Sequence, residues 1–174
     1  MKCVASNKDI SRRKLEEFGR EQACKKVGIF LNYALADKCG YSDIQIGRIH
    51  TSINKAIEDV ESGRLSVGGI KKFLEEKYNA VIFLGENRQA PPGMKKDFVS
   101  GVYSFMDRFN IILIYVLLEK YGMKGEKVNA IMEYISNSAE CCNLGYATEE
   151  EIEQVILNED KVSLRQIRGM SCGR

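Results

Sequence analysis

The chain has 174 residues, of which 44% are hydrophobic, and its 26 Lys and Arg against 24 Asp and Glu leave a formal net charge of +2. This apolar content is sufficient for a hydrophobic core that needs no metal or disulfide to stabilise it. The small net charge excludes strong steering of the whole molecule onto nucleic acid or an anionic membrane, so any such contact must come from a local patch.

Residues 12–78 are predicted to form a first helical unit. Its first helix runs from about residue 14 to residue 38 and ends at Gly40, because glycine readily adopts the positive φ that closes a helix. A second helix follows and ends before Gly63. Its apolar residues, spaced three and four apart, are Ile46, Ile49, Ile53, Ile57 and Val60. Ser66 then caps a short third helix, whose inward stripe is Ile70, Phe73 and Leu74.

Residues 79–93 differ from the helices and are predicted to be a linker. Residues 81–84 are β-prone, and Pro91 and Pro92 cannot continue a helix. We favour a short extended segment that packs against the helices. The alternative is an edge strand that pairs with a partner.

Residues 94–158 are predicted to repeat the unit without a gap. At an offset of 82 residues, the matched glycines are Gly19 and Gly101, Gly40 and Gly122, and Gly63 and Gly145. Thr148 and Glu151 predict a capping box at the third helix, and residues 159–174 are expected to be a loosely held tail. Two unrelated hairpins with glycine stops would also agree in part. We favour an all-α protein made of two tandem copies of a three-helix unit.

Catalytic and metal-binding patterns are absent from the sequence. His50 is the only histidine, so a Ser–His–Asp or Cys–His arrangement can be built only around that residue, which we expect to be partly exposed on the second helix. There is no CxxC or HxxxH zinc pattern and no phosphate-binding loop. We therefore expect no enzyme, no cofactor and no metal.

The cysteines and the apolar runs indicate a soluble protein of a reducing compartment. The six cysteines include no CxxC pair, and adjacent Cys141 and Cys142 are expected to be small buried residues of a helix. No secretory signal is evident at the start of the chain. The longest apolar run, residues 109–118, is shorter than the roughly 20 residues that a membrane span requires, so we expect no span.

Residues 35–49 resemble the helix-turn-helix of phage repressor-type DNA readers. The matching residues are Ala36, Gly40, Ser42, Ile46 and Ile49. The resemblance implies that the start of the second helix faces base edges in the major groove. Its candidate contacts are Ser42, Asp43, Gln45 and Arg48. In the second copy the same end carries Lys124 and Lys127, so its surface chemistry is different.

The two copies share the pattern L-x-x-K-[CY]-G-[YM]-x(4)-[IV]-x-x-[IV]-x(3)-I, followed by a later glycine and a capped short helix. This repeated unit is similar to small helical accessory proteins of Gram-positive phages and mobile elements. This resemblance implies a cytoplasmic protein of a bacterial host cell that occludes a macromolecular partner, a host protein or nucleoprotein. Its most specific form is an inhibitor of a CRISPR RNA-guided nuclease. The basic residues Arg12, Arg13 and Lys14 are further candidate contacts. The alternatives are a DNA-binding regulator and an assembly protein that forms a homodimer.

Overall fold

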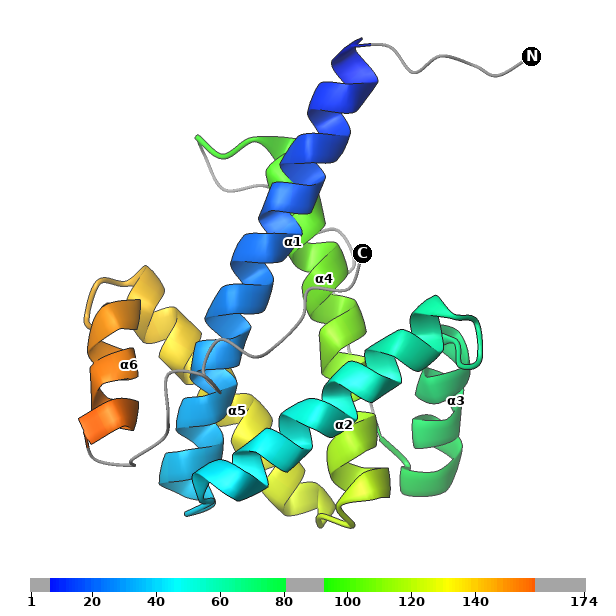
Figure 1. Cartoon of the computed structure of the whole chain (residues 1–174), viewed down its shortest axis with the longest axis vertical. Coiled ribbons are helices and arrows are strands. Elements are labelled where there is room, and N and C mark those ends of the chain that lie inside the picture. Colours follow the sequence, from blue (N-terminus) through cyan, green and yellow to red (C-terminus); the bar gives the residue numbers. More distant parts are fainter. Residues whose placement is uncertain (1–6, 81–92, 159–174) are drawn as a thin grey trace.

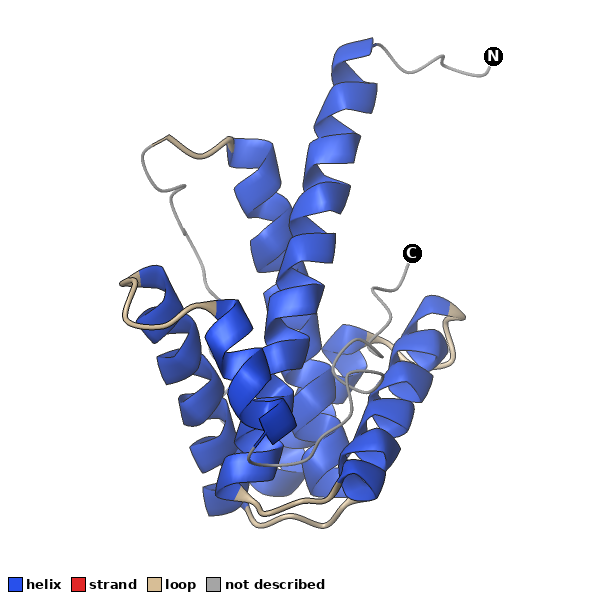
Figure 2. Ribbon diagram, turned by 60° about the vertical axis from the view of Figure 1, so that its left-hand side comes forward, coloured by secondary structure: helices blue, strands red, loops and turns tan. Residues whose placement is uncertain are grey.

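A computed structural model describes residues 7–80 and 93–158, which are helical without any strand, as expected for an all-α protein (Figures 1 and 2). In chain order the elements are α1 (Asn7–Tyr33), η1 (Ala34–Lys38), α2 (Asp43–Glu61), α3 (Val67–Tyr78), α4 (Lys96–Tyr115), η2 (Val116–Lys120), α5 (Gly125–Asn143) and α6 (Glu149–Asn158). The first helix thus begins at Asn7 rather than near residue 14. The β-prone residues 81–84, the prolines of the linker and the tail 159–174 lie outside the described residues.

The two halves of the described chain follow the same backbone plan. Helices α2 and α5 each have 19 residues, and each follows a five-residue π-helical turn, η1 or η2. The glycine after each turn has a positive φ, 61° at Gly40 and 58° at Gly122. The amides of Tyr41 and Met123 then bond six residues back, to Leu35 and Leu117, which is one residue further than in a Schellman helix end. All these features recur at the offset of 82 residues, whereas their origin by duplication stays a prediction.

Helices α1 and α4 lie side by side and run in the same direction (Figure 1), and they make the most extensive contact in the molecule. Two glycines permit the close approach. A Cβ atom on Gly19 would collide with the carbonyl oxygen of Phe98, and one on Gly101 would collide with that of Glu16. Glu16 and Phe98 are also 82 residues apart, so the two contacts are mutually equivalent. This reciprocity is typical of a two-fold axis, here an approximate one within a single chain.

Each half packs its later helices against the first helix of the other half. Helices α2 and α3 contact α4, while α5 and α6 contact α1. The buried residues accordingly form one continuous cluster that includes Leu35 and Ile49 from one half and Leu117 and Ile131 from the other. The two predicted repeats therefore share a single core.

The continuous helix Lys96–Lys120 is long and apolar enough to cross a membrane by length and composition. A core helix of a soluble protein passes the same test. Its apolar residues Ile111, Leu113 and Leu117 are fully buried in the shared cluster, which is the environment of a core helix.

Candidate binding site

Most of the predicted contact residues lie at one end of the molecule, where α2 and α5 begin (Figure 1). We call this region the turn end. Its predicted members are Ser42, Asp43, Gln45, Arg48, Lys124 and Lys127. The two halves meet here, because Lys127 Nζ donates a hydrogen bond of 3.3 Å to the Tyr41 hydroxyl. The structure thus brings these six side chains into one region from two separate helix starts.

Gln45 has a local structural role at the start of α2. Its Oε1 accepts the backbone N–H of Ser42 at 2.9 Å and the Ser42 hydroxyl at 3.1 Å, which caps the helix. The Gln45 amide oxygen is therefore engaged within the protein. Arg48 and Lys124 are exposed and make no ion pair within the described residues, so they remain the free cations of the turn end.

Other charges at the turn end are paired with aromatic or acidic side chains. The hydrogen bond to the Tyr41 hydroxyl raises the pKa of Lys127 by favouring its charged form. Tyr134 donates a hydrogen bond of 2.7 Å to Asp37, and Lys38 lies 4.6 Å from the centre of the same tyrosine ring. These contacts join α5 to η1 and stabilise the junction between the halves.

Arg12, Arg13 and Lys14 lie near the opposite end of α1. At 1.5 Å per helical residue, Lys14 and Lys38 are about 36 Å apart. The predicted contact residues therefore do not form one surface. They form two separate groups, at the two ends of the α1–α4 pair.

Two further cations lie at the same end of the molecule as Arg12, Arg13 and Lys14, and they were not among the predicted contact residues. Lys95 and Lys96 stand exposed at the start of α4, and Arg12 Nε lies 3.4 Å from Asp97 Oδ1 of that helix. We call Arg12, Arg13, Lys14, Lys95 and Lys96 the basic arm. The signal was present in the sequence, because Arg13 and Lys14 fall on Lys95 and Lys96 at the offset of 82 residues. The positive end of the α4 dipole adds to this field.

Exposed apolar side chains lie beside the basic arm. Phe18 is 50% exposed and Met94 is 55% exposed, and the ring of Phe18 lies 5.8 Å from that of Phe98. Arginine together with large apolar residues is the composition enriched in protein interfaces. The arm therefore combines positive charge with apolar contact area.

His50 is buried, so the expectation of a partly exposed imidazole was wrong. It is 5% exposed, and its Nε2 lies 2.6 Å from Oδ1 of buried Asn32. Burial lowers the pKa of His50 to about 4, which leaves the ring neutral at pH 7. At the offset of 82 residues the second half has Ile114 and Met132 instead. Asn32 on α1 and His50 on α2 thus form a polar pair within an otherwise apolar part of the core.

The remaining candidate residues are the possible metal ligands and the adjacent cysteines. No group of three or more His, Cys, Asp and Glu there could hold a metal ion. Cys141 is exposed and Cys142 is half-buried, so the expectation that both are buried was wrong for Cys141. Burial raises the pKa of Cys142, which keeps its thiol protonated.

Comparisons with protein families, curated proteins and solved structures find no match to this chain. The fold and the two charged ends define it as an all-α protein of two interlocked three-helix halves.

Proposed function

We propose that the chain is a non-enzymatic binding protein that covers an anionic surface of a macromolecular partner, a host protein or nucleoprotein. The observation that carries this proposal is the basic arm. Cations from both halves gather at one end because α1 and α4 run in parallel, and exposed Phe18 and Met94 lie beside them. A local patch of this kind attracts polyanions even though the net charge is only +2.

The most specific form of the proposal is inhibition of a CRISPR RNA-guided nuclease in the cytoplasm of a bacterial host. It is supported by the resemblance of the repeated unit to phage accessory proteins. A nuclease that carries a guide RNA presents phosphate groups, which the basic arm could bind. The protein would then act by blocking access of the substrate DNA.

A cleavage assay tests this form. Excess protein should lower the rate of DNA cleavage by the guide-loaded nuclease of the host. Lys95→Glu with Lys96→Glu should relieve the inhibition, whereas Lys71→Glu with Lys72→Glu reverses the same number of charges on α3 and should not. An unchanged cleavage rate in excess wild-type protein would contradict the inhibitor form. Loss of inhibition in both double variants would show that overall charge, not the basic arm, is responsible.

A DNA-binding regulator is the second candidate, and the exposed Arg48 on the second turn of α2 favours it. Two-fold helix-turn-helix readers place their recognition helices about 34 Å apart, in successive major grooves. Here the starts of α2 and α5 are joined by the Tyr41–Lys127 hydrogen bond, so only one helix could enter a groove at a time. Micromolar binding to random duplex DNA, lost steeply with salt and weakened by Arg48→Ala, is the expected result for a regulator. Absence of that binding would remove this candidate.

The third candidate, an assembly protein, predicts a stable homodimer. Sedimentation of the purified chain distinguishes it from the binding protein, which is expected to be monomeric without its partner.

A further inference from the structure

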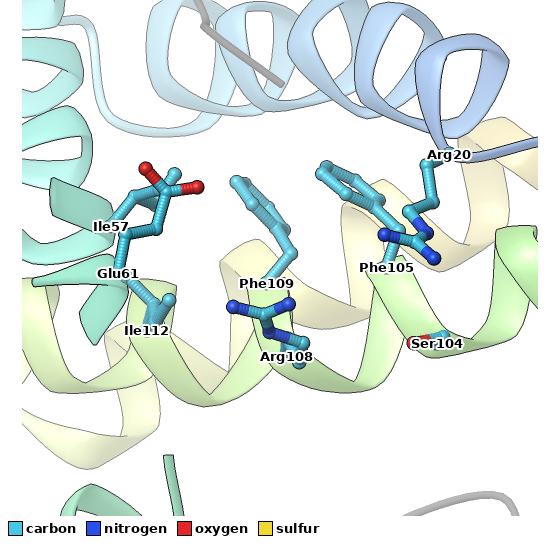
Figure 3. Close-up of a pocket in the computed structure, with 8 residues that line it drawn as sticks. All are labelled: Arg20, Ile57, Glu61, Ser104, Phe105, Arg108, Phe109 and Ile112. Carbon is cyan, nitrogen blue, oxygen red and sulfur yellow. The ribbon is translucent and has the colours of Figure 1, made fainter. Parts of the chain in front are cut away.

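A small hollow lies between the middle of α1, the end of α2 and α4, away from both charged ends. Its volume is about 40 Å³, and its lining includes Arg20, Arg108, Glu61, Phe105 and Phe109 (Figure 3). Figure 3 shows Arg20 and Glu61 at opposite ends of this row of side chains, with the two phenylalanine rings between them. The rings are stacked, with centroids 5.5 Å apart, and give the hollow an apolar wall.

Both arginines of the hollow have unused hydrogen-bonding capacity. Arg20 Nε is buried and has no hydrogen-bond partner among the described residues. Arg108 is exposed, and no ion pair within residues 7–80 and 93–158 involves it. A buried donor without an acceptor is unfavourable, so the Arg20 guanidinium favours a ligand that brings an acceptor.

The equivalent contact elsewhere in the molecule shows which acceptor fits this position. At the offset of 82 residues Arg108 corresponds to Lys26, whose Nζ lies 2.6 Å from Oε1 of Glu149 at the start of α6. Glu149 corresponds to Val67 at the start of α3, which has no polar group. The second half therefore supplies a carboxylate to Lys26 of the first half, whereas the first half supplies none to Arg108 of the second half.

We infer that the hollow binds one carboxylate of an acidic side chain from a partner protein. Its volume holds about three water molecules at about 15 Å³ each, which suits the three heavy atoms of a carboxylate. The two guanidinium groups supply charge-assisted donors, and Phe105 and Phe109 supply contact for an apolar neighbour of the acidic residue. Glu61 disfavours a ligand with many negative charges, such as nucleic acid. The inference rests on the proposed function only in supposing that the partner is a protein.

Nuclear magnetic resonance of the full-length, ¹⁵N-labelled chain tests the site directly. The probe is the dipeptide N-acetyl-Phe-Glu-amide, and the matched control is N-acetyl-Phe-Gln-amide, which has the same shape without the charge. The Nε–Hε signals of Arg20 and Arg108 should shift and saturate with the glutamate peptide alone. An equal shift with the glutamine peptide would overturn the inference. So would an equal shift with inorganic phosphate at the same ionic strength, or no shift with any probe.

Variants locate the binding within the hollow. Arg20→Gln and Arg108→Gln should each weaken peptide binding about tenfold, as expected for loss of a charge-assisted hydrogen bond. Arg64→Gln removes an arginine that donates to Asp59 at 2.7 Å on the α2–α3 turn, and should leave the affinity unchanged. The wild-type titration requires no variant, so the test holds even if Arg20→Gln fails to fold.

The equivalence of Arg108 and Val67 to Lys26 and Glu149 suggests one more variant. Val67→Glu should place a carboxylate beside Arg108, as Glu149 lies beside Lys26, and should weaken peptide binding about tenfold by competition. Unchanged affinity in this variant would contradict the argument from equivalence. The residues of the basic arm do not line the hollow. Failure of the cleavage assay and failure of the peptide titration are therefore distinguishable.

Discussion

Gly19 on α1 and Gly101 on α4 are equivalent residues, and each lies against the backbone of the other helix. Gly19 faces the carbonyl of Phe98, and Gly101 faces that of Glu16. A methyl group at either position would collide with backbone atoms, which cannot rotate away as a side chain can. These two residues therefore set how closely α1 and α4 approach.

Gly19→Ala and Gly101→Ala should each destabilise the fold by about 1–3 kcal/mol, because the strain of overpacking exceeds the gain in helix propensity. Gly68→Ala is the matched control. This exposed residue of α3 has nothing within 4 Å of its added Cβ, so the substitution should be neutral or stabilising by up to about 1 kcal/mol. Urea unfolding measures all three. Wild-type stability of both crossing variants would contradict the close contact.

The buried His50 should make the stability depend on pH in a defined window. Its pKa is about 4 in the folded state, below the ordinary value of 6.5, so the unfolded chain binds more protons between these values. Stability should fall as the pH is lowered from about 6.5 towards 4, by up to about 3 kcal/mol, with no contribution above this range. Thermal or urea unfolding across the window measures this fall.

The second half supplies a control for that prediction. Asn32→Ile with His50→Met gives the first half the residues found at the equivalent positions, Ile114 and Met132. The double variant should lose the pH dependence due to His50 and be more stable at pH 7, because Asn32 Nδ2 and His50 Nδ1 are buried without partners among the described residues. Since the chain has one histidine, an identical pH profile in the variant would refute the assignment.

The helix caps at α3 and α6 should have measurable and similar effects. Ser66 Oγ accepts the amide of Gly69 at 3.0 Å, and Thr148 Oγ1 accepts that of Glu151 at 3.1 Å. Ser66→Ala and Thr148→Ala should each cost about 1 kcal/mol in the free energy of unfolding. Ser66→Gly should cost only a few tenths of that amount. Urea unfolding measures all three variants, and equal costs for Ser66→Ala and Ser66→Gly would contradict the capping role of Ser66.

Features set by neighbouring residues could be predicted from the sequence. The ends of α2, the Ser66 cap and the Thr148–Glu151 box follow from local spacing, and the structure confirms them. Burial of His50 also follows from spacing, because it lies four residues after Ile46 and three before Ile53, and we failed to apply that rule to it. Its pairing with Asn32 was not predictable, since Asn32 lies on another helix and only tertiary packing brings the two together. The π-helical turns likewise carry no sequence pattern that we recognised.

The candidate binding surfaces also differ in how far local sequence could predict them. Ser42, Asp43, Gln45 and Arg48 of the turn end were proposed as contacts because they belong to a local motif, whereas their nearness to Lys124 and Lys127 was not predicted. The basic arm and the hollow require the packing of α1 against α4, which brings Arg12 near Asp97 and Arg108 near Arg20. Contacts between distant segments depend on the tertiary arrangement. The matched glycines indicated a repeat in the sequence, but they did not indicate that each copy packs against the first helix of the other.

The exchange of helices between the halves has a consequence for how the chain assembles. Because α2 and α3 cover α4 while α5 and α6 cover α1, neither half retains its core alone. The two halves are arranged like the subunits of an obligate dimer on one chain, so that each half meets the other at the high effective concentration of a single molecule. A tethered dimer need not remain symmetric. The shared interior holds both halves in the same fold, while equivalent positions on their outer faces differ, as Glu149 and Val67 do.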